Sequence, residues 1–96
     1  MLFELLYTVK ANEALNRLQV EDEKKFTKVQ KTLGLMETNL KNPGLQTHKY
    51  DAISGADGEE VWEAYVENNT PSAYRVFWHY GPGRAIITIV DVTPHP

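Results

Sequence analysis

The chain of 96 residues contains no cysteine. A disulfide framework, a thiolate nucleophile and a thiolate metal site are therefore excluded, and the absence fits a reducing compartment such as the cytoplasm. Long apolar runs are also missing. The most apolar stretch, residues 2–9, is too short to span a bilayer and is interrupted by Glu4. It lacks the basic start and cleavage site of a signal peptide, so we expect a soluble chain without a membrane partner.

Basic residues are scarce in the second half of the chain. The formal net charge is −3, and the acidic excess falls in residues 47–96, which carry three Lys/Arg against seven Asp/Glu. Residues 1–46 are nearly balanced, with seven against six. Proteins that bind nucleic acid on their own gather a basic patch, because releasing counterions from phosphates supplies much of the affinity. The composition therefore argues against autonomous nucleic-acid binding.

Length and composition indicate a single domain over residues 1–96. The 42% hydrophobic content is enough for one core, and no repeat, linker or low-complexity segment interrupts the chain.

Apolar residues recur at helical spacing between residues 10 and 40. Residues 10–18 predict a short helix, and Asp22 is placed to cap a second one. Along this second helix the apolar residues follow one another at intervals of three and four: Phe26, Val29, Leu33, Met36 and Leu40. The segment Asn42-Pro43-Gly44 ends the helical region, because proline cannot continue a helix and glycine suits a turn.

The remaining segments have strand character. They are residues 2–9, His48–Ile53, Val61–Glu67, and two β-branched and aromatic runs that flank Gly81-Pro82-Gly83 as a hairpin. The order predicts an α+β fold with an N-terminal strand and a helical hairpin. A three- to four-stranded antiparallel sheet follows and packs on the helices.

Candidate functional residues lie in the last hairpin. Alternation places Arg75, Phe77 and His79 on one face, which we expect to be the face left open by the helices. Arginine suits phosphate binding, whereas a histidine such as His95 suits proton transfer. The residues alone leave simpler interpretations open. Arg75 is also explained as a surface residue paired with Glu63 or Glu67.

The three histidines lack the spacing of metal ligands, so we expect neither a metal nor another cofactor.

Two short motifs carry a resemblance to a known family. The chain resembles the RelE/ParE superfamily of toxins from type II toxin–antitoxin systems over nearly its whole length. The most specific matches are the Leu40-Lys41-Asn42-Pro43-Gly44 end of the helical hairpin and the Tyr74-Arg75-Val76 element. A β-branched strand then leads to the C-terminal His95.

The resemblance implies a ribosome-dependent endonuclease that cleaves mRNA, in which a 2′-hydroxyl attacks its own phosphate. By position, Arg75 would stabilise charge on the phosphate and His95 would be the general acid. Lys49 or His48 falls where the family places a base or a phosphate contact. The implied partners are a cognate antitoxin, the ribosome and mRNA. An antitoxin helix would bind in a groove between helices and sheet.

One departure keeps two alternatives open. Catalytic members of the family are usually strongly basic, whereas this chain has acids close by in sequence: Glu59, Glu60, Glu63 and Glu67. A ParE-like toxin directed at DNA gyrase needs no ribonuclease residues. A non-catalytic member would bind only an antitoxin.

Overall fold

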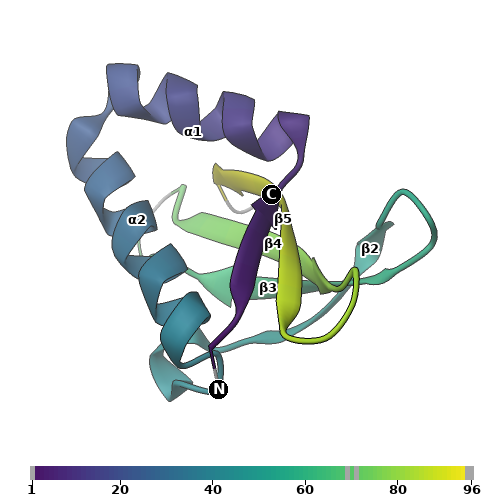
Figure 1. The fold of residues 1–96 in the computed structure, drawn as a ribbon. Coiled ribbons are helices and arrows are strands. Elements are labelled where there is room, and N and C mark those ends of the chain that lie inside the picture. The colour runs from purple at the N-terminus through teal and green to yellow at the C-terminus, as the bar shows by residue number, and fades with distance from the viewer. Residues whose placement is uncertain (1, 69, 71, 95–96) are drawn as a thin grey trace.

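The computed structural model describes residues 2–68, 70 and 72–94, so His95 lies outside the described residues. Two helices and five strands follow one another along the chain (Figure 1). In chain order they are β1 (Glu4–Tyr7), α1 (Val9–Glu21), α2 (Glu23–Thr38), β2 (His48–Ser54), β3 (Glu60–Tyr65), β4 (Tyr74–Tyr80) and β5 (Ile86–Pro94). The predicted α+β architecture is confirmed.

Side-chain caps separate the two helices at the predicted break. Thr8 caps α1 by accepting a hydrogen bond from the N–H of Ala11 at 3.1 Å. Asp22 caps α2 in the same way through the N–H of Lys25, as expected from the sequence. The second helix ends at Thr38, so Leu40, predicted as the last residue of its apolar stripe, lies beyond it. Pro43–Leu45 form a single 3₁₀ turn instead of continuing the helix. No helix among the described residues is long and apolar enough to cross a membrane.

All five strands form one sheet in the order β1-β5-β4-β3-β2. Strands β2 to β5 pair antiparallel, in line with the prediction. The N-terminal strand adds a fifth, parallel strand beside β5. Because the helical hairpin and three strands intervene, a pairing between the first and last strands cannot be read from local pattern.

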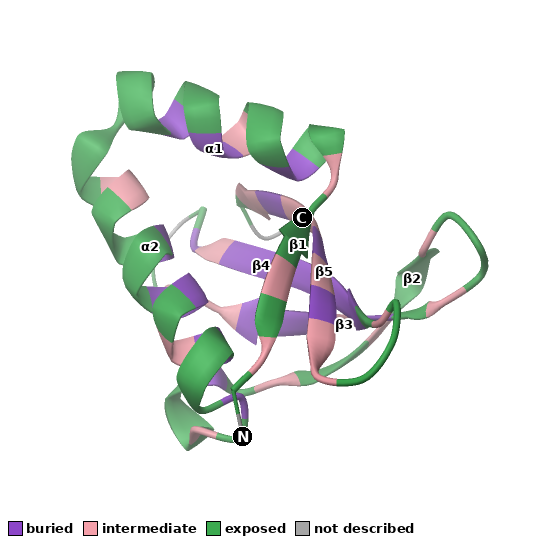
Figure 2. Ribbon diagram, in the orientation of Figure 1, coloured by how far each residue is buried: buried purple, intermediate pink, exposed green. Residues whose placement is uncertain are grey.

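The core lies between the helices and one face of the sheet (Figure 2). The sheet contributes Val76, Trp78, Ile87 and Ile89, all fully buried. The apolar stripe of α2 packs against them through Val29, Leu33 and Met36. Each such side chain contributes about 1.5–3 kcal/mol on burial. The indole Nε1 of Trp78 is buried and has no hydrogen-bond partner in the described structure.

The opposite face of the sheet is covered in part by β2 and the turn that follows it. The ring of Tyr50 lies 4.8 Å from that of Phe77, and Glu59 of the turn faces His79. Arg75 and His79 share this face, as alternation along β4 predicts. They are nevertheless only 6% and 7% exposed, so the face is more enclosed than the sequence led us to expect.

Candidate functional site

Ionisable side chains gather on the sheet face that the helices leave free. The strand register brings Glu63 of β3 beside His48 of β2, and sets Tyr65 opposite Arg75 of β4. Directly opposed residues on neighbouring strands point to the same face. Three consecutive strands therefore place His48, Glu63, Tyr65 and Arg75 on one surface.

His48 and Glu63 form a close histidine–carboxyl pair. The carbonyl oxygen of Gln46 lies 2.8 Å from His48 Nδ1, which must carry a hydrogen because a carbonyl only accepts. His48 Nε2 lies 2.7 Å from Glu63 Oε1, within ion-pair distance of the carboxyl. Glu63 is 2% exposed, and its Oε2 has no partner in the described structure. The His48 side chain is 46% exposed and connects this buried carboxyl to solvent.

Arg75 is held by backbone groups and by an aromatic ring. Its Nη1 donates to the carbonyl oxygens of Glu67 at 2.6 Å and Tyr74 at 3.1 Å. The guanidinium carbon lies 3.6 Å from the centre of the Tyr65 ring, a cation–π distance. The same ring lies 5.8 Å from that of His48, edge to face. Tyr65 thus stands between the arginine and the His48–Glu63 pair.

Glu67 fixes the segment that holds Arg75. Its carboxylate pairs with Lys25 and Lys28 of α2 and accepts the N–H of Tyr74 at 3.2 Å. Burial raises the pKa of Glu67, but the hydrogen bonds from Lys25, Tyr74 and Lys28 outweigh it and hold the pKa below its ordinary value. The interpretation of Arg75 as an ion-pair partner of Glu63 or Glu67 is therefore wrong. The guanidinium binds the carbonyl of Glu67, because two lysines already occupy its carboxylate.

The structure brings some of the site residues predicted from the sequence together and separates others. His48 and Arg75 come together on one face, whereas Lys49 points to the opposite face by strand alternation. Lys49 is solvent-exposed and pairs with Glu60 at 3.0 Å, and the hydrogen bond and charge of Glu60 raise its pKa. Glu63 and Tyr65 were missed. Their alternation along β3 on the parity that faces Arg75 was the available signal.

A second carboxylate makes this face more acidic. Glu59 accepts the N–H of Asp57 at 3.0 Å, and hydrogen bonds from its own N–H and that of Asp57 lower its pKa. Its Oε2 lies 3.9 Å from His79 Nε2. Within the described residues no three His, Asp or Glu side chains gather as a metal site would require. The arrangement sets a histidine and a buried carboxyl side by side, with one guanidinium beyond the Tyr65 ring.

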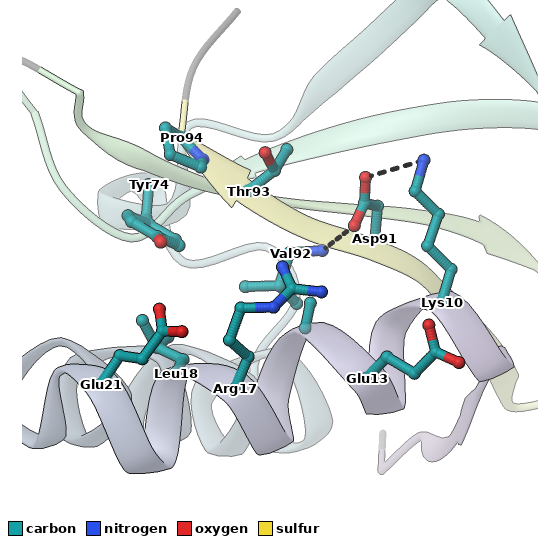
Figure 3. Close-up of a pocket in the computed structure, with 11 residues that line it drawn as sticks. Lys10, Glu13, Arg17, Leu18, Glu21, Tyr74, Asp91, Val92, Thr93 and Pro94 are labelled. Carbon is teal, nitrogen blue, oxygen red and sulfur yellow. Dashed lines mark hydrogen bonds and ion pairs between the residues drawn. The ribbon is translucent and has the colours of Figure 1, made fainter.

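A cleft of about 320 Å³ runs between α1 and the end of β5 (Figure 3). Its base is apolar, formed by Ala14, Leu18 and Val92, and charged side chains line its rim: Lys10, Glu13, Arg17, Glu21 and Asp91. Lys10 pairs with Asp91 at 3.2 Å. Arg17 extends over the cleft towards β5 (Figure 3) and has no carboxylate within ion-pair distance among the described residues. The resemblance to the RelE/ParE toxins implies a groove between helices and sheet, and this cleft lies between α1 and β5.

Comparison by sequence finds no matching protein-family model and no matching curated protein. Comparison by structure finds close folds. A YoeB/ParE toxin from Agrobacterium tumefaciens superposes with a TM-score of 0.73 at 10% identity, covering 98% of this chain and all of that one. The DinJ–YafQ toxin–antitoxin complex from Escherichia coli gives 0.70 at 11% identity, covering 99% and 94% of the two chains. The RelE–RelB complex from Pyrococcus horikoshii gives 0.67 at 15%, covering 98% and 96%.

These neighbours match the element order and the sheet over almost the full chain, although sequence identity is low. The chain therefore has the fold of the RelE/ParE toxins, which confirms at the level of the fold the resemblance carried by its Asn-Pro turn and its Tyr74-Arg75-Val76 element.

Proposed function

We propose that the protein is the toxin of a type II toxin–antitoxin pair and cleaves mRNA on the ribosome. The observation that carries the proposal is the His48–Glu63 pair, in which His48 Nε2 lies 2.7 Å from Glu63 Oε1. The Arg75 guanidinium lies just beyond the Tyr65 ring. A proton acceptor beside a fixed cation is the minimum needed for attack of a 2′-hydroxyl on the adjacent phosphate. The fold supports the toxin assignment.

The reaction follows from the chemistry of these groups. The 2′-hydroxyl loses its proton to the His48–Glu63 pair in its deprotonated form as its oxygen bonds to phosphorus, and the P–O5′ bond breaks. The products are a 2′,3′-cyclic phosphate and a 5′-hydroxyl, whose oxygen takes a proton from a general acid. We assign that step to His95, in keeping with its position in the sequence. Arg75 stabilises the charge that develops on the phosphate oxygens.

Arg75 must change partners for this role. Its Nη1 is engaged by the Glu67 carbonyl at 2.6 Å, and the side chain is almost fully buried. A phosphate oxygen is a stronger acceptor than a carbonyl because it is charged. The proposal therefore requires a shift of the Glu67 segment when RNA binds, and it makes the free protein a weak nuclease.

The charge of the chain points to the ribosome as the source of RNA affinity. The candidate face carries Glu59 and Glu63, and the net charge of −3 disfavours free RNA. Contacts with ribosomal components would have to supply the binding free energy. We therefore expect cleavage of translated mRNA and little cleavage of naked RNA.

The partner expected for such a toxin is a cognate antitoxin. The cleft between α1 and β5 has an apolar base and the cationic side chain of Arg17 above it. An amphipathic antitoxin segment that carries an acidic residue would suit both features. Arg17→Glu should weaken the complex at least about tenfold, which is about 1.4 kcal/mol.

The decisive experiment is cell-free translation with purified protein, reading mRNA cleavage by primer extension. Wild type should cut inside translated codons, and Arg75→Ala and Glu63→Gln should not. Arg84→Ala is the matched control, because Arg84 is exposed in the turn before β5. Intact message with wild-type protein would refute the ribonuclease assignment.

The burial of Arg75 favours one rival, a toxin that acts by binding a protein such as DNA gyrase. That rival predicts intact mRNA in the same assay, together with inhibition of gyrase-dependent supercoiling by wild-type protein.

A further inference from the structure

Strand β1 is an edge of the sheet, and we infer that it pairs with β1 of a second copy of the chain about a two-fold axis at Leu6. Its inner side is paired with β5, and no described strand pairs with its outer side. Just before the strand, the N–H of Phe3 donates to the carbonyl oxygen of Glu37 in α2 at 2.9 Å, so the free edge begins at Glu4. This inference does not rest on the proposed function, because the site described above lies on β2, β3 and β4.

Exposed apolar residues concentrate at this edge. Leu2, Leu6, Tyr7 and Val9, on or beside β1, are 69%, 37%, 37% and 73% exposed. The other large apolar side chains exposed among the described residues are scattered singly: Val20, Ile53 and Tyr80. Soluble proteins usually guard such edges with lysine, proline or a bulge. β1 is short and carries Glu4, but it has no lysine, proline or bulge, and its exposed apolar side chains favour a covering partner.

The hydrogen bonds to β5 determine which backbone groups of β1 are free. The N–H groups of Glu4 and Thr8 donate to β5 and the turn before it, at 2.8 Å and 3.0 Å. In a parallel pair alternate residues point to the same neighbour, so Leu5 and Tyr7 direct their N–H and C=O groups outward. Two outward residues separated by one are suited to antiparallel pairing with an identical strand. Leu5 then pairs with Tyr7 of the second copy, and Tyr7 with its Leu5.

This register has consequences for side chains and charge. Leu6 lies on the axis and faces its own counterpart as a non-hydrogen-bonded pair, with Cα atoms about 4.5 Å apart. Glu4 lies opposite Thr8 of the other copy. Thr8 caps the N-terminus of α1, whose first turn contains no acidic residue. A carboxylate is stabilised there by the helix dipole, so the only charged residue of β1 favours the pairing.

Single-cysteine variants of the full-length protein test the register directly, because the chain has no native cysteine. Leu6→Cys places two thiols within disulfide distance across the axis. Glu4→Cys, on the same strand, leaves them about 14 Å apart, four residues at 3.4 Å each. After mild oxidation we expect a covalent dimer of Leu6→Cys and monomeric Glu4→Cys. Equal cross-linking of both variants would overturn the inference.

The equilibrium is measured by sedimentation over a range of protein concentrations. Wild type should dimerise, and Leu6→Lys should dimerise at least about tenfold more weakly because two like charges meet on the axis. Mixing Leu6→Lys with Leu6→Glu should restore dimerisation as a heterodimer. Val20→Lys, 86% exposed on α1, is the control and should dimerise like wild type. A wild-type protein that stays monomeric throughout would overturn the inference and leave the edge to a strand of another protein.

Discussion

Glu67 holds Arg75 through its backbone and α2 through its side chain. Its carbonyl oxygen accepts Arg75 Nη1 at 2.6 Å, while its carboxylate binds Lys25 and Lys28. One residue therefore links the second helix to the only arginine of the candidate site. A substitution of Glu67 should therefore change both the free energy of unfolding and the position of the Arg75 side chain.

Glu67→Gln should destabilise the protein. The neutral amide cannot balance the positive charges of Lys25 and Lys28. The Glu67 side chain is only 9% exposed, so water cannot fully replace the lost ion pairs. We expect a loss of about 1–3 kcal/mol in the free energy of unfolding, measured with urea. Glu60→Gln is the matched control. It also removes a lysine-paired carboxylate, but that pair is exposed and should be worth less than about 1 kcal/mol.

The free energy of unfolding should fall in acid, partly because Glu67 becomes protonated and loses its ion pairs. Hydrogen bonds hold its pKa below the ordinary value despite burial. A carboxyl with a lowered folded-state pKa contributes stability above its unfolded pKa of about 4.3, and this is lost as the pH falls through the folded pKa. Urea titrations between pH 7 and pH 3 should show a smaller loss for Glu67→Gln than for wild type. Parallel curves for the two proteins would contradict the ion-pair role.

Two glycine-to-alanine changes should have opposite signs. Gly34 lies inside α2 and Gly58 in the β2–β3 turn, and a Cβ at either position meets no atom within 4 Å. Gly34→Ala should stabilise the protein by about 0.5–1 kcal/mol, because alanine is the better helix former. Gly58 has φ of +84°, so Gly58→Ala should cost about 1–2 kcal/mol. Thermal unfolding of both variants measures the difference. Stabilisation by both would mean that the turn is not left-handed in solution.

Neighbouring residues of β2 should differ in their effect on RNA cleavage. His48→Gln removes the proton carrier beside Glu63 and should slow ribosome-dependent cleavage about 100-fold. Lys49→Met breaks only an exposed ion pair with Glu60. Such pairs contribute little free energy, so the cleavage rate should change less than about twofold. Equal losses in primer-extension assays would show that the His48–Glu63 pair is not the proton acceptor.

Arg75→Lys should not rescue the site. Lysine keeps the charge but lacks the planar group that stacks on Tyr65 and reaches the Glu67 carbonyl. We expect the cleavage rate to fall at least about tenfold, because losing one charge-assisted hydrogen bond costs at least about 1.4 kcal/mol. Circular dichroism of the variant controls for folding. Wild-type rates with lysine at this position would reduce the role of Arg75 to that of a general positive charge.

Local sequence determined the elements of this protein. The Asp22 cap, the three- and four-residue spacing from Phe26 to Met36 and the turn glycines each act within a few residues, so pattern alone predicted the helices and the hairpin. Alternation along β4 likewise placed Arg75 and His79 on one face. Helices and strands have fixed backbone periods, so the order of polar and apolar residues is enough to predict these features.

Tertiary structure decided what those elements do together. The strand register is what places His48 beside Glu63. The packing of α2 near the end of β3 is what lets the Glu67 carboxylate pair with Lys25 and Lys28 instead of with Arg75. The parallel pairing of β1 with β5, and hence the open edge at Leu6, depends on contacts between the two ends of the chain. Such pairings reflect competition among distant partners for burial and hydrogen bonds, and a local pattern does not encode the result.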